Sequence, residues 1–255
     1  MEGIREGVLT SPDGRFFRHR GKHGPAIPAS GGTVEIDGAG KFDIDCAAPA
    51  SGEESLVYKC SRVGRTSANT VTAIKACPPE SYNDWLISRV VHSRVPADCR
   101  RLFVEFEQAH FYDDSSIFIC PFYGGGTLQR AIRVYQKTGR RMEEPLVMYY
   151  SIELLKIVSA LHSAGVIHAD IKPDNIMIRS DDVELDDWGD WTSSQSRGGW
   201  DHKGLVLIDY GRAIDRTFYP QGTLFCGKCH SETFTCADMR ADLPWGFQID
   251  THGIA

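Results

Sequence analysis

Four polar residues in the second half of the chain have the types and the spacing that phosphoryl transfer requires. Asp170, Lys172 and Asn175 lie in one short polar loop, and Asp209 follows a later apolar run. Because this reaction leaves a protein little covalent work, its groups must position the nucleophile and neutralise charge on the transferred oxygens. Asp170 is predicted to accept the proton of a substrate hydroxyl, and Lys172 to contact the transferred phosphate. Asn175 and Asp209 offer the oxygen ligands that Mg²⁺ prefers, so they are the predicted metal ligands.

Short apolar runs must position these groups. Val166–Ile167 and Ile176–Ile178 flank the polar loop, and Leu205–Ile208 leads into Asp209. A loop between two strands, with an acidic residue at the end of another strand, brings the four side chains to one edge. Any one of these residues alone is typical of a solvated turn, whereas the two segments together favour a phosphoryl-transfer site.

Strands are predicted to dominate residues 42–122, and helices to dominate the rest. The predicted elements of the first region are a hairpin over Phe42–Cys60 with a small-residue loop at 47–52, a strand at Val71–Cys77, a helix around 85–91, and strands at 102–106 and 117–122.

The glycine-rich stretch Tyr123–Gly126 is the predicted boundary between the two regions. Thr127 is placed as the N-cap of the next helix. A longer helix, 144–163, is expected to be buried on most sides, because apolar residues occur almost all round it. The acidic stretch 180–204 is typical of a solvated insertion. Residues 1–41, rich in Gly, Pro and Arg, are typical of a flexible extension.

Composition excludes several classes of protein. With 42% hydrophobic and 24% charged residues, the chain is neither fully disordered nor fibrous. The net charge of -6 argues against direct nucleic-acid binding, which usually leaves a basic footprint. No apolar run is long enough for a membrane span, and the first 30 residues lack the apolar core of a secretory signal. A reducing compartment is therefore expected.

The cysteines are mostly isolated, as small buried hydrophobes would be. Cys226, Cys229 and His230 are the exception, because their spacing matches a haem-attachment pattern or half of a zinc site. Cys236 or His252 could complete such a zinc site. The favoured interpretation is that these are ordinary loop residues.

The chemistry-bearing segments resemble the motifs of protein kinases. The sequence H-A-D-I-K-P-D-N, from His168 to Asn175, is similar to the catalytic loop of the family, and D-Y-G at Asp209–Gly211 is similar to D-F-G. Thr72–Lys75 resembles the V-A-I-K strand, and Ala50–Val57 takes the place of the glycine-rich loop with only its middle glycine kept. The nucleotide site that this resemblance implies comprises Gly52, Val57, Ala73, Lys75, Asp84, Pro121 and Tyr123.

Further segments narrow the resemblance to the Bub-type mitotic checkpoint serine/threonine kinases, over roughly residues 42–255. They are Ala109–Phe111, Tyr123–Leu128, Ile208–Asp215, Phe218–Thr223, Lys228–Cys229 and Pro244–Asp250.

The resemblance implies an α+β, two-lobed eukaryotic protein kinase fold. Its N-terminal lobe, 42–122, would be a small antiparallel β-sheet, and its C-terminal lobe, 123–255, would be mainly helical and incomplete. ATP and Mg²⁺ would be the cofactors, and protein serine or threonine hydroxyls the acceptors. The resemblance likewise implies nuclear and kinetochore location, checkpoint protein partners, and substrates such as a centromeric histone tail. It also implies a monomeric catalytic domain without membrane or direct nucleic-acid contacts. Asp250 would orient the backbone of the catalytic loop.

Two departures from the family pattern carry consequences. The glutamate that pairs with the nucleotide-binding lysine is missing, so Asn83, Asp84 and Glu80 are the candidate partners of Lys75, with Asp84 favoured. Ala169 replaces an arginine that binds an activation-segment phosphate, so switching by that phosphate is not expected. The glycine-rich loop with only its middle glycine, the missing glutamate and the incomplete C-terminal lobe leave a second hypothesis open, a pseudokinase or scaffold that binds checkpoint partners without turnover.

Overall fold

The chain divides into two compact units. The computed structural model describes residues 14–52, 55–64, 71–180, 203–227 and 234–254. Unit 1 comprises Met1–Leu86 and Glu105–Phe122, and unit 2 comprises Ile87–Val104 and Tyr123–Ala255. Among the described residues, no helix combines the length and the apolar character needed to cross a membrane.

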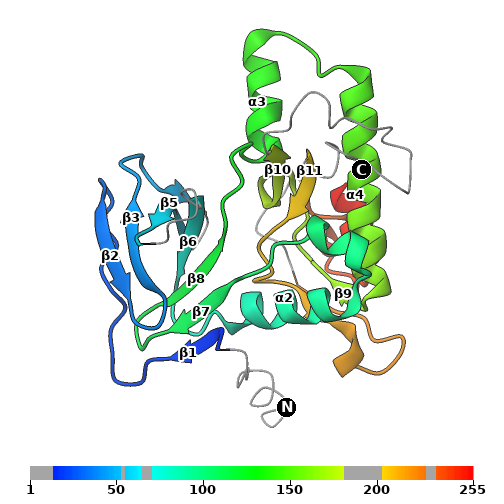
Figure 1. Cartoon of the computed structure of the whole chain (residues 1–255). Helices are drawn as coiled ribbons and strands as arrows, with labels where there is room; N and C mark the ends of the chain where they lie inside the picture. Colours follow the sequence, from blue (N-terminus) through cyan, green and yellow to red (C-terminus); the bar gives the residue numbers. More distant parts are fainter. Residues whose placement is uncertain (1–13, 53–54, 65–70, 181–202, 228–233, 255) are drawn as a thin grey trace. The chain divides into compact units, whose positions relative to one another are not determined.

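Unit 1 is built on one eight-stranded sheet, drawn in blue to green in Figure 1. The strand order is β1-β7-β8-β6-β5-β3-β2, and β4 pairs with β5 beside this path. β1 runs parallel to β7, whereas the other paired strands are antiparallel. The strands are β1 (Phe16–Arg18), β2 (Gly32–Ile36), β3 (Gly40–Ile44), β4 (Ala50–Ser51), β5 (Leu56–Arg62), β6 (Val71–Cys77), β7 (Gln108–Phe111) and β8 (Ser116–Pro121).

The two faces of this sheet bury different side chains, as the two-residue period of a strand requires. Ile74, Ile117 and Ile119 join the aliphatic core on one face. On the other face, Phe118 packs against Phe106 and Phe111, with ring centroids 5.0 and 5.7 Å apart. Lys75 lies directly opposite Phe118 in the ladder, so it projects from this aromatic face.

Two strands within residues 14–41, β1 and β2, join the sheet, which corrects the prediction of a flexible extension for this part of the chain; residues 1–13 lie outside the described residues. β2 pairs with β3 over its full length, from Gly32 opposite Ile44 to Ile36 opposite Gly40. Val34 and Ile36 are buried in the aliphatic core. This strand is only five residues long and lies between glycines, so the composition of the region indicates a flexible extension rather than a strand.

The predicted strand at 102–106 is also wrong. A 3₁₀-helix occupies Ala97–Leu102, and the strand lies later, at β7. Leu102, Phe103 and Val104 are buried, so the apolar run marks a buried segment that is mostly irregular. Short apolar runs do not by themselves distinguish a strand from other buried backbone.

Helix α2 (Tyr82–Arg94) was predicted from its apolar spacing, and its residues are divided between the two units. Trp85 in unit 1 is fully buried, and Val91 in unit 2 is buried as well. The first turn of the helix therefore belongs to unit 1 and its later turns to unit 2.

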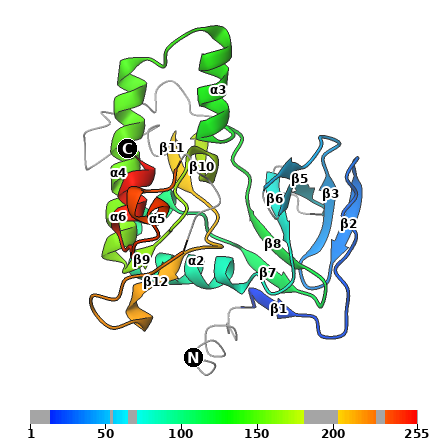
Figure 2. The ribbon, with the colours of Figure 1, turned by 180° about the vertical axis from the view of Figure 1, so that it is seen from behind.

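Unit 2 contains the two predicted helices, α3 (Leu128–Thr138) and α4 (Glu144–Ser163). Thr127 caps α3 as predicted, because its hydroxyl accepts the Arg130 N–H over 3.1 Å. Gly139 ends α3 in the left-handed conformation, with φ of 65°, where a side chain would be strained. Figure 2 shows the short helices α5 (Ala237–Arg240) and α6 (Gln248–Gly253) beside α4.

Helix α4 is less buried than its apolar content predicted. Ile157, Val158 and Leu161 face the interior, but Met148 and Leu155 are 56% and 60% exposed. The apolar content of the helix overestimates its burial, because many apolar side chains of folded proteins remain exposed to solvent.

Two small antiparallel sheets of unit 2 frame the polar loop at 168–175. β9 (Val166–Ile167) pairs with β12 (Ile214–Asp215), and β10 (Ile176–Ser180) pairs with β11 (Lys203–Leu207). The strands expected on both sides of the loop and before Asp209 are therefore present. The predicted acidic insertion, 180–204, is shorter at both ends, since its terminal residues belong to β10 and β11 and its remaining residues lie outside the described part.

Candidate active site

The side chains of Lys172 and Asn175 meet at the carboxylate of Asp170. Lys172 Nζ lies 3.0 Å from Asp170 Oδ2, and Asn175 Nδ2 donates to the same oxygen over 3.0 Å. The same amide nitrogen donates to the Asp170 backbone oxygen over 2.9 Å. All three residues are buried. One carboxylate oxygen is thus held by two donors, which fixes the orientation of Asp170 before any substrate binds.

A buried carboxylate holds the backbone of this loop. Asp250 Oδ1 accepts the Ala169 N–H over 2.9 Å, and Asp250 Oδ2 accepts the His168 N–H over 2.8 Å. His162 Nε2 lies 3.0 Å from the same Oδ2 atom. Ala169 has φ of 64°, a left-handed conformation that costs roughly 1–3 kcal/mol in a residue with a side chain. The Asp250 contacts stabilise that conformation and match the role that the family resemblance implied.

Asp209 follows a segment that is hydrogen-bonded to the same loop. The Ile208 N–H donates to the Asn175 backbone oxygen over 3.0 Å, and His168 Nε2 lies 3.1 Å from the Ile208 oxygen. Asp209 itself has φ of 68°, the second left-handed residue of this region. The structure thus ties the residue preceding Asp209 to the residues flanking Asp170, and two unusual backbone conformations occur together at the predicted site.

In unit 1, Lys75 forms an ion pair with Asp84, the favoured one of its three candidate partners. Lys75 Nζ lies 3.1 Å from Asp84 Oδ2, and both side chains are largely buried, at 12% and 5% exposed. Asp84 stands in the first turn of α2, where a carboxylate is also stabilised by the helix dipole. The shorter side chain of aspartate therefore reaches the lysine of β6 in this fold.

The remaining predicted nucleotide-site residues lie on the strands of unit 1, directly after β4, and at the start of unit 2. Ala50 pairs with Val57 across the β4–β5 hairpin, and the Gly52 N–H donates to the Ser55 oxygen over 2.8 Å. Ala73 is buried on β6. The other two members are Pro121, exposed at the end of β8, and Tyr123, at the start of unit 2.

A salt bridge that the sequence did not reveal links α2 to the segment after Asp209. Arg94 donates twice to Asp215, over 2.9 Å to Oδ1 and 2.8 Å to Oδ2, and also donates to the Ala164 oxygen over 3.0 Å. Burial raises the pKa of Asp215, but the hydrogen bonds from Arg94 and Thr217 outweigh it and lower that pKa below its ordinary value. The pair is 121 residues apart in sequence, so no local pattern could have identified it.

Four of the seven described cysteines are buried as small hydrophobes, whereas Cys46 is exposed and Cys99 is half-buried. Cys60, Cys77, Cys120 and Cys236 are buried, and burial raises the pKa of Cys60 and of Cys120 to about 12. Cys226 is exposed, while Cys229 and His230 lie outside the described residues. Within the described ranges, no group of three or more His, Cys, Asp or Glu side chains is arranged to hold a metal. A Mg²⁺ ion bound mainly through nucleotide phosphates needs only one or two protein ligands.

Comparison with known proteins identifies the same family as these motifs. The protein kinase domain family matches residues 51–202. The mitotic checkpoint serine/threonine-protein kinase BUB1 of Arabidopsis thaliana is 39% identical over 74% of this chain and 35% of its own length. BUB1 of Mus musculus is 33% identical over 71% of this chain and 16% of its own length. The chain therefore spans about a third or less of these relatives.

A solved structure gives the matching fold. The crystal structure of the BubR1 kinase domain superposes with a TM-score of 0.78 at 26% identity, and the match covers 99% of this chain and 69% of that one. The predicted α+β protein kinase fold is thus confirmed. The chain belongs to the protein kinase family, and its relatives include Bub-type checkpoint kinases.

Proposed function

We propose that this chain transfers phosphate from ATP to serine and threonine hydroxyls of proteins. The observation that carries the proposal is the Asp170 carboxylate, held by Lys172 and Asn175 within a buried loop. Its relatives named as serine/threonine kinases support the same reaction.

Asp170 is proposed as the base that accepts the proton of the substrate hydroxyl. With its Oδ2 atom fixed by two donors, the carboxylate does not have to reorganise when the hydroxyl arrives. Lys172 is proposed to stabilise negative charge on the transferred group while also holding Asp170. One loop would thereby supply both proton acceptance and charge neutralisation.

Asn175 and Asp209 are proposed as the protein ligands of magnesium. The Asn175 amide nitrogen is committed to Asp170, so its oxygen is the atom that the geometry leaves for a cation. Amide and carboxylate oxygens form the hard donor set that suits Mg²⁺. When bound with ATP, the ion supplies charge neutralisation on the phosphate oxygens.

Lys75 is proposed to contact the phosphates of the nucleotide, with Asp84 fixing its ammonium group. Gly52, Val57, Ala73, Pro121 and Tyr123 are proposed to complete the nucleotide site.

The checkpoint role is proposed from the relatives. It would place the protein at the kinetochore in the nucleus, with checkpoint proteins as partners and a substrate such as a centromeric histone tail. The Arg94–Asp215 salt bridge supports activity without a phosphorylated activation segment, because a carboxylate of this chain already occupies the arginine.

Transfer of labelled γ-phosphate from MgATP to core histones tests the proposal. We expect incorporation on serine and threonine by the wild-type chain and a loss of at least about a hundredfold in Asp209→Asn. Equal incorporation by both proteins would overturn it. Tight MgATP binding without transfer would favour the scaffold hypothesis instead.

A further inference from the structure

Helix α3 presents a row of cations on the side opposite its buried face. Arg130, Arg133 and Lys137 are all exposed, and their spacing of i, i+3 and i+7 aligns them along the helix. Val134 lies beside this row and is 54% exposed. With a rise of about 1.5 Å per residue, the row extends about 10 Å.

The row is unfavourable for the helix itself. α3 contains no acidic residue, and the ion pair recorded beside it in the described part of the chain joins Arg140 to Glu143 instead. Like charges three and four residues apart destabilise a helix by about 0.2–0.5 kcal/mol per pair. Arg130 also lies in the first turn, where the helix dipole disfavours a positive charge. An arrangement that the isolated helix disfavours is explained if an external anion balances it.

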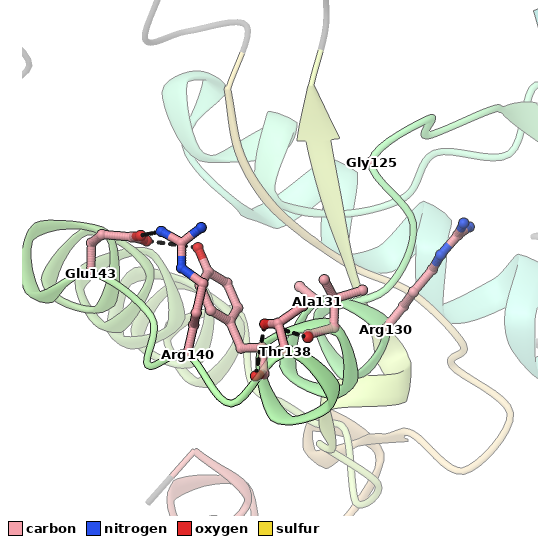
Figure 3. A pocket seen from close by; sticks show the side chains of 8 residues that line it. Gly125, Arg130, Ala131, Thr138, Arg140 and Glu143 are labelled. Atoms are coloured by element: carbon pink, nitrogen blue, oxygen red, sulfur yellow. Dashed lines mark hydrogen bonds and ion pairs between the residues drawn. The ribbon is translucent and has the colours of Figure 1, made fainter.

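A pocket between α3 and the start of α4 adjoins the row. Ala131, Val134, Tyr135 and Thr138 line it, and Arg130 is shared between the pocket and the cationic row. At one end, Glu143 accepts the Tyr135 hydroxyl over 2.7 Å and an Arg140 N–H over 3.2 Å. Figure 3 shows Arg140 and Glu143 closing this end, while Arg130 extends away from them at the other.

We infer that this surface, Arg130, Arg133, Val134 and Lys137 with the adjoining pocket, docks an acidic segment of a partner protein that carries one apolar side chain. The acidic side chains would pair with the cations, and the apolar one would contact Val134 and Ala131. This role goes beyond phosphate transfer and does not depend on it.

Charge and size favour an acidic polypeptide over a nucleic acid. The chain as a whole has a net charge of -6, which repels a long polyanion. A row of three cations with an exposed valine fits a short mixed segment better than a phosphate backbone, whose binding usually requires a more extensive basic surface.

The test uses the full chain and a fluorescent 12-residue peptide with glutamates at i, i+3 and i+7 and one leucine. We expect binding that weakens as salt rises, and an affinity about tenfold lower in Arg130→Gln/Arg133→Gln/Lys137→Gln. The matched control, Arg18→Gln/Arg100→Gln/Arg240→Gln, removes three exposed cations elsewhere and should bind within about twofold of wild type. Val134→Ser should weaken binding of the leucine-containing peptide but not binding of an analogue with alanine in place of the leucine.

Equal losses in the two triple variants would overturn the proposal, because they would indicate a general charge effect. Tighter binding of a single-stranded DNA 20-mer than of the peptide, lost in the α3 variant, would overturn it in favour of nucleic acid. All three altered residues of α3 are exposed, and a thermal unfolding temperature no lower than that of wild type in both triple variants separates docking from folding.

Discussion

The loop that carries Asp170 and the strand that carries Lys75 hold their polar side chains in different ways. In the loop, two donors converge on one Asp170 oxygen, and Asp250 accepts two backbone N–H groups. On the strand, Lys75 forms an ion pair with Asp84, and the neighbouring hairpin contains Gly52.

This difference suggests a division of roles. A group that accepts a proton in the transition state acts more effectively when its position is already fixed. The buried hydrogen bonds of the loop fix Asp170 in this way. Lys75, which is proposed to contact phosphates that already carry charge, is instead oriented by an ion pair with a carboxylate. We therefore expect changes in the loop to affect kcat and changes around Lys75 to affect KM for ATP.

The largest expected effect is that of Asp170→Asn. The amide cannot accept the proton, so kcat should fall by roughly 10²–10⁴. MgATP affinity, measured by calorimetry, should stay within about twofold, because Asp170 is not proposed to contact the nucleotide. A retained kcat would contradict the assignment of Asp170 as the base.

Asp250→Ala should lower the free energy of unfolding by about 2–5 kcal/mol, because two buried N–H groups would lose their acceptor. Urea unfolding measures this change. Asp250→Asn is the matched control and should lose less, since its amide oxygen can still accept one of them. If both variants matched wild type, the loop would not depend on Asp250.

Arg94→Ala should cost about 1.5–3 kcal/mol of stability, because it removes a bidentate, charge-assisted contact to buried Asp215. Since the folded pKa of Asp215 is lowered, the contribution of this pair is present above its ordinary pKa of about 3.8 and is lost as pH falls through the lowered value. Acid unfolding of wild type and variant should therefore converge at low pH. Arg94→Lys keeps the charge without the paired geometry and should lie between them.

His110, in strand β7, is expected to make the stability of the folded chain sensitive to acid. Burial and the neighbouring His19 lower the pKa of His110 to about 3, while Asp37 opposes the shift. Because the unfolded chain binds a proton below about pH 6.5 and the folded chain does not, stability falls as pH drops below that value. Between pH 7.5 and 5 the loss is about 2 kcal/mol.

Measuring thermal unfolding at both pH values tests this expectation. Lys22 and Tyr112 also face the histidine pair, and His110→Phe leaves them in place while removing the titrating ring. The variant should lose less stability at pH 5 than wild type does. An identical pH dependence would exclude His110 as its source.

The smallest effect is expected for Asp84→Ala. The substitution removes the ion pair that orients the Lys75 ammonium group, so KM for ATP should rise by roughly tenfold with kcat changed less. Steady-state kinetics at varied ATP measure both parameters. A change confined to kcat would contradict the expectation that Lys75 and its surroundings act on KM for ATP while the loop acts on kcat.

The sequence alone determined the local chemistry and much of the secondary structure. The strand-loop-strand around Asp170, the cap at Thr127 and the helix at 144–163 follow from short-range patterns, because hydrogen-bond partners and apolar spacing lie within a few residues. For Lys75 the sequence offered three candidate partners, of which Asp84 was favoured. The choice depends on the position of α2, because that position decides which side chain reaches the lysine.

Only the tertiary structure decided the features that depend on distant residues. The Arg94–Asp215 pair, the incorporation of β1 and β2 into the sheet, and the exposure of Met148 and Leu155 have no short-range signal. Burial and long-range pairing are set by what each element packs against, and sequence patterns give only the face that could be buried.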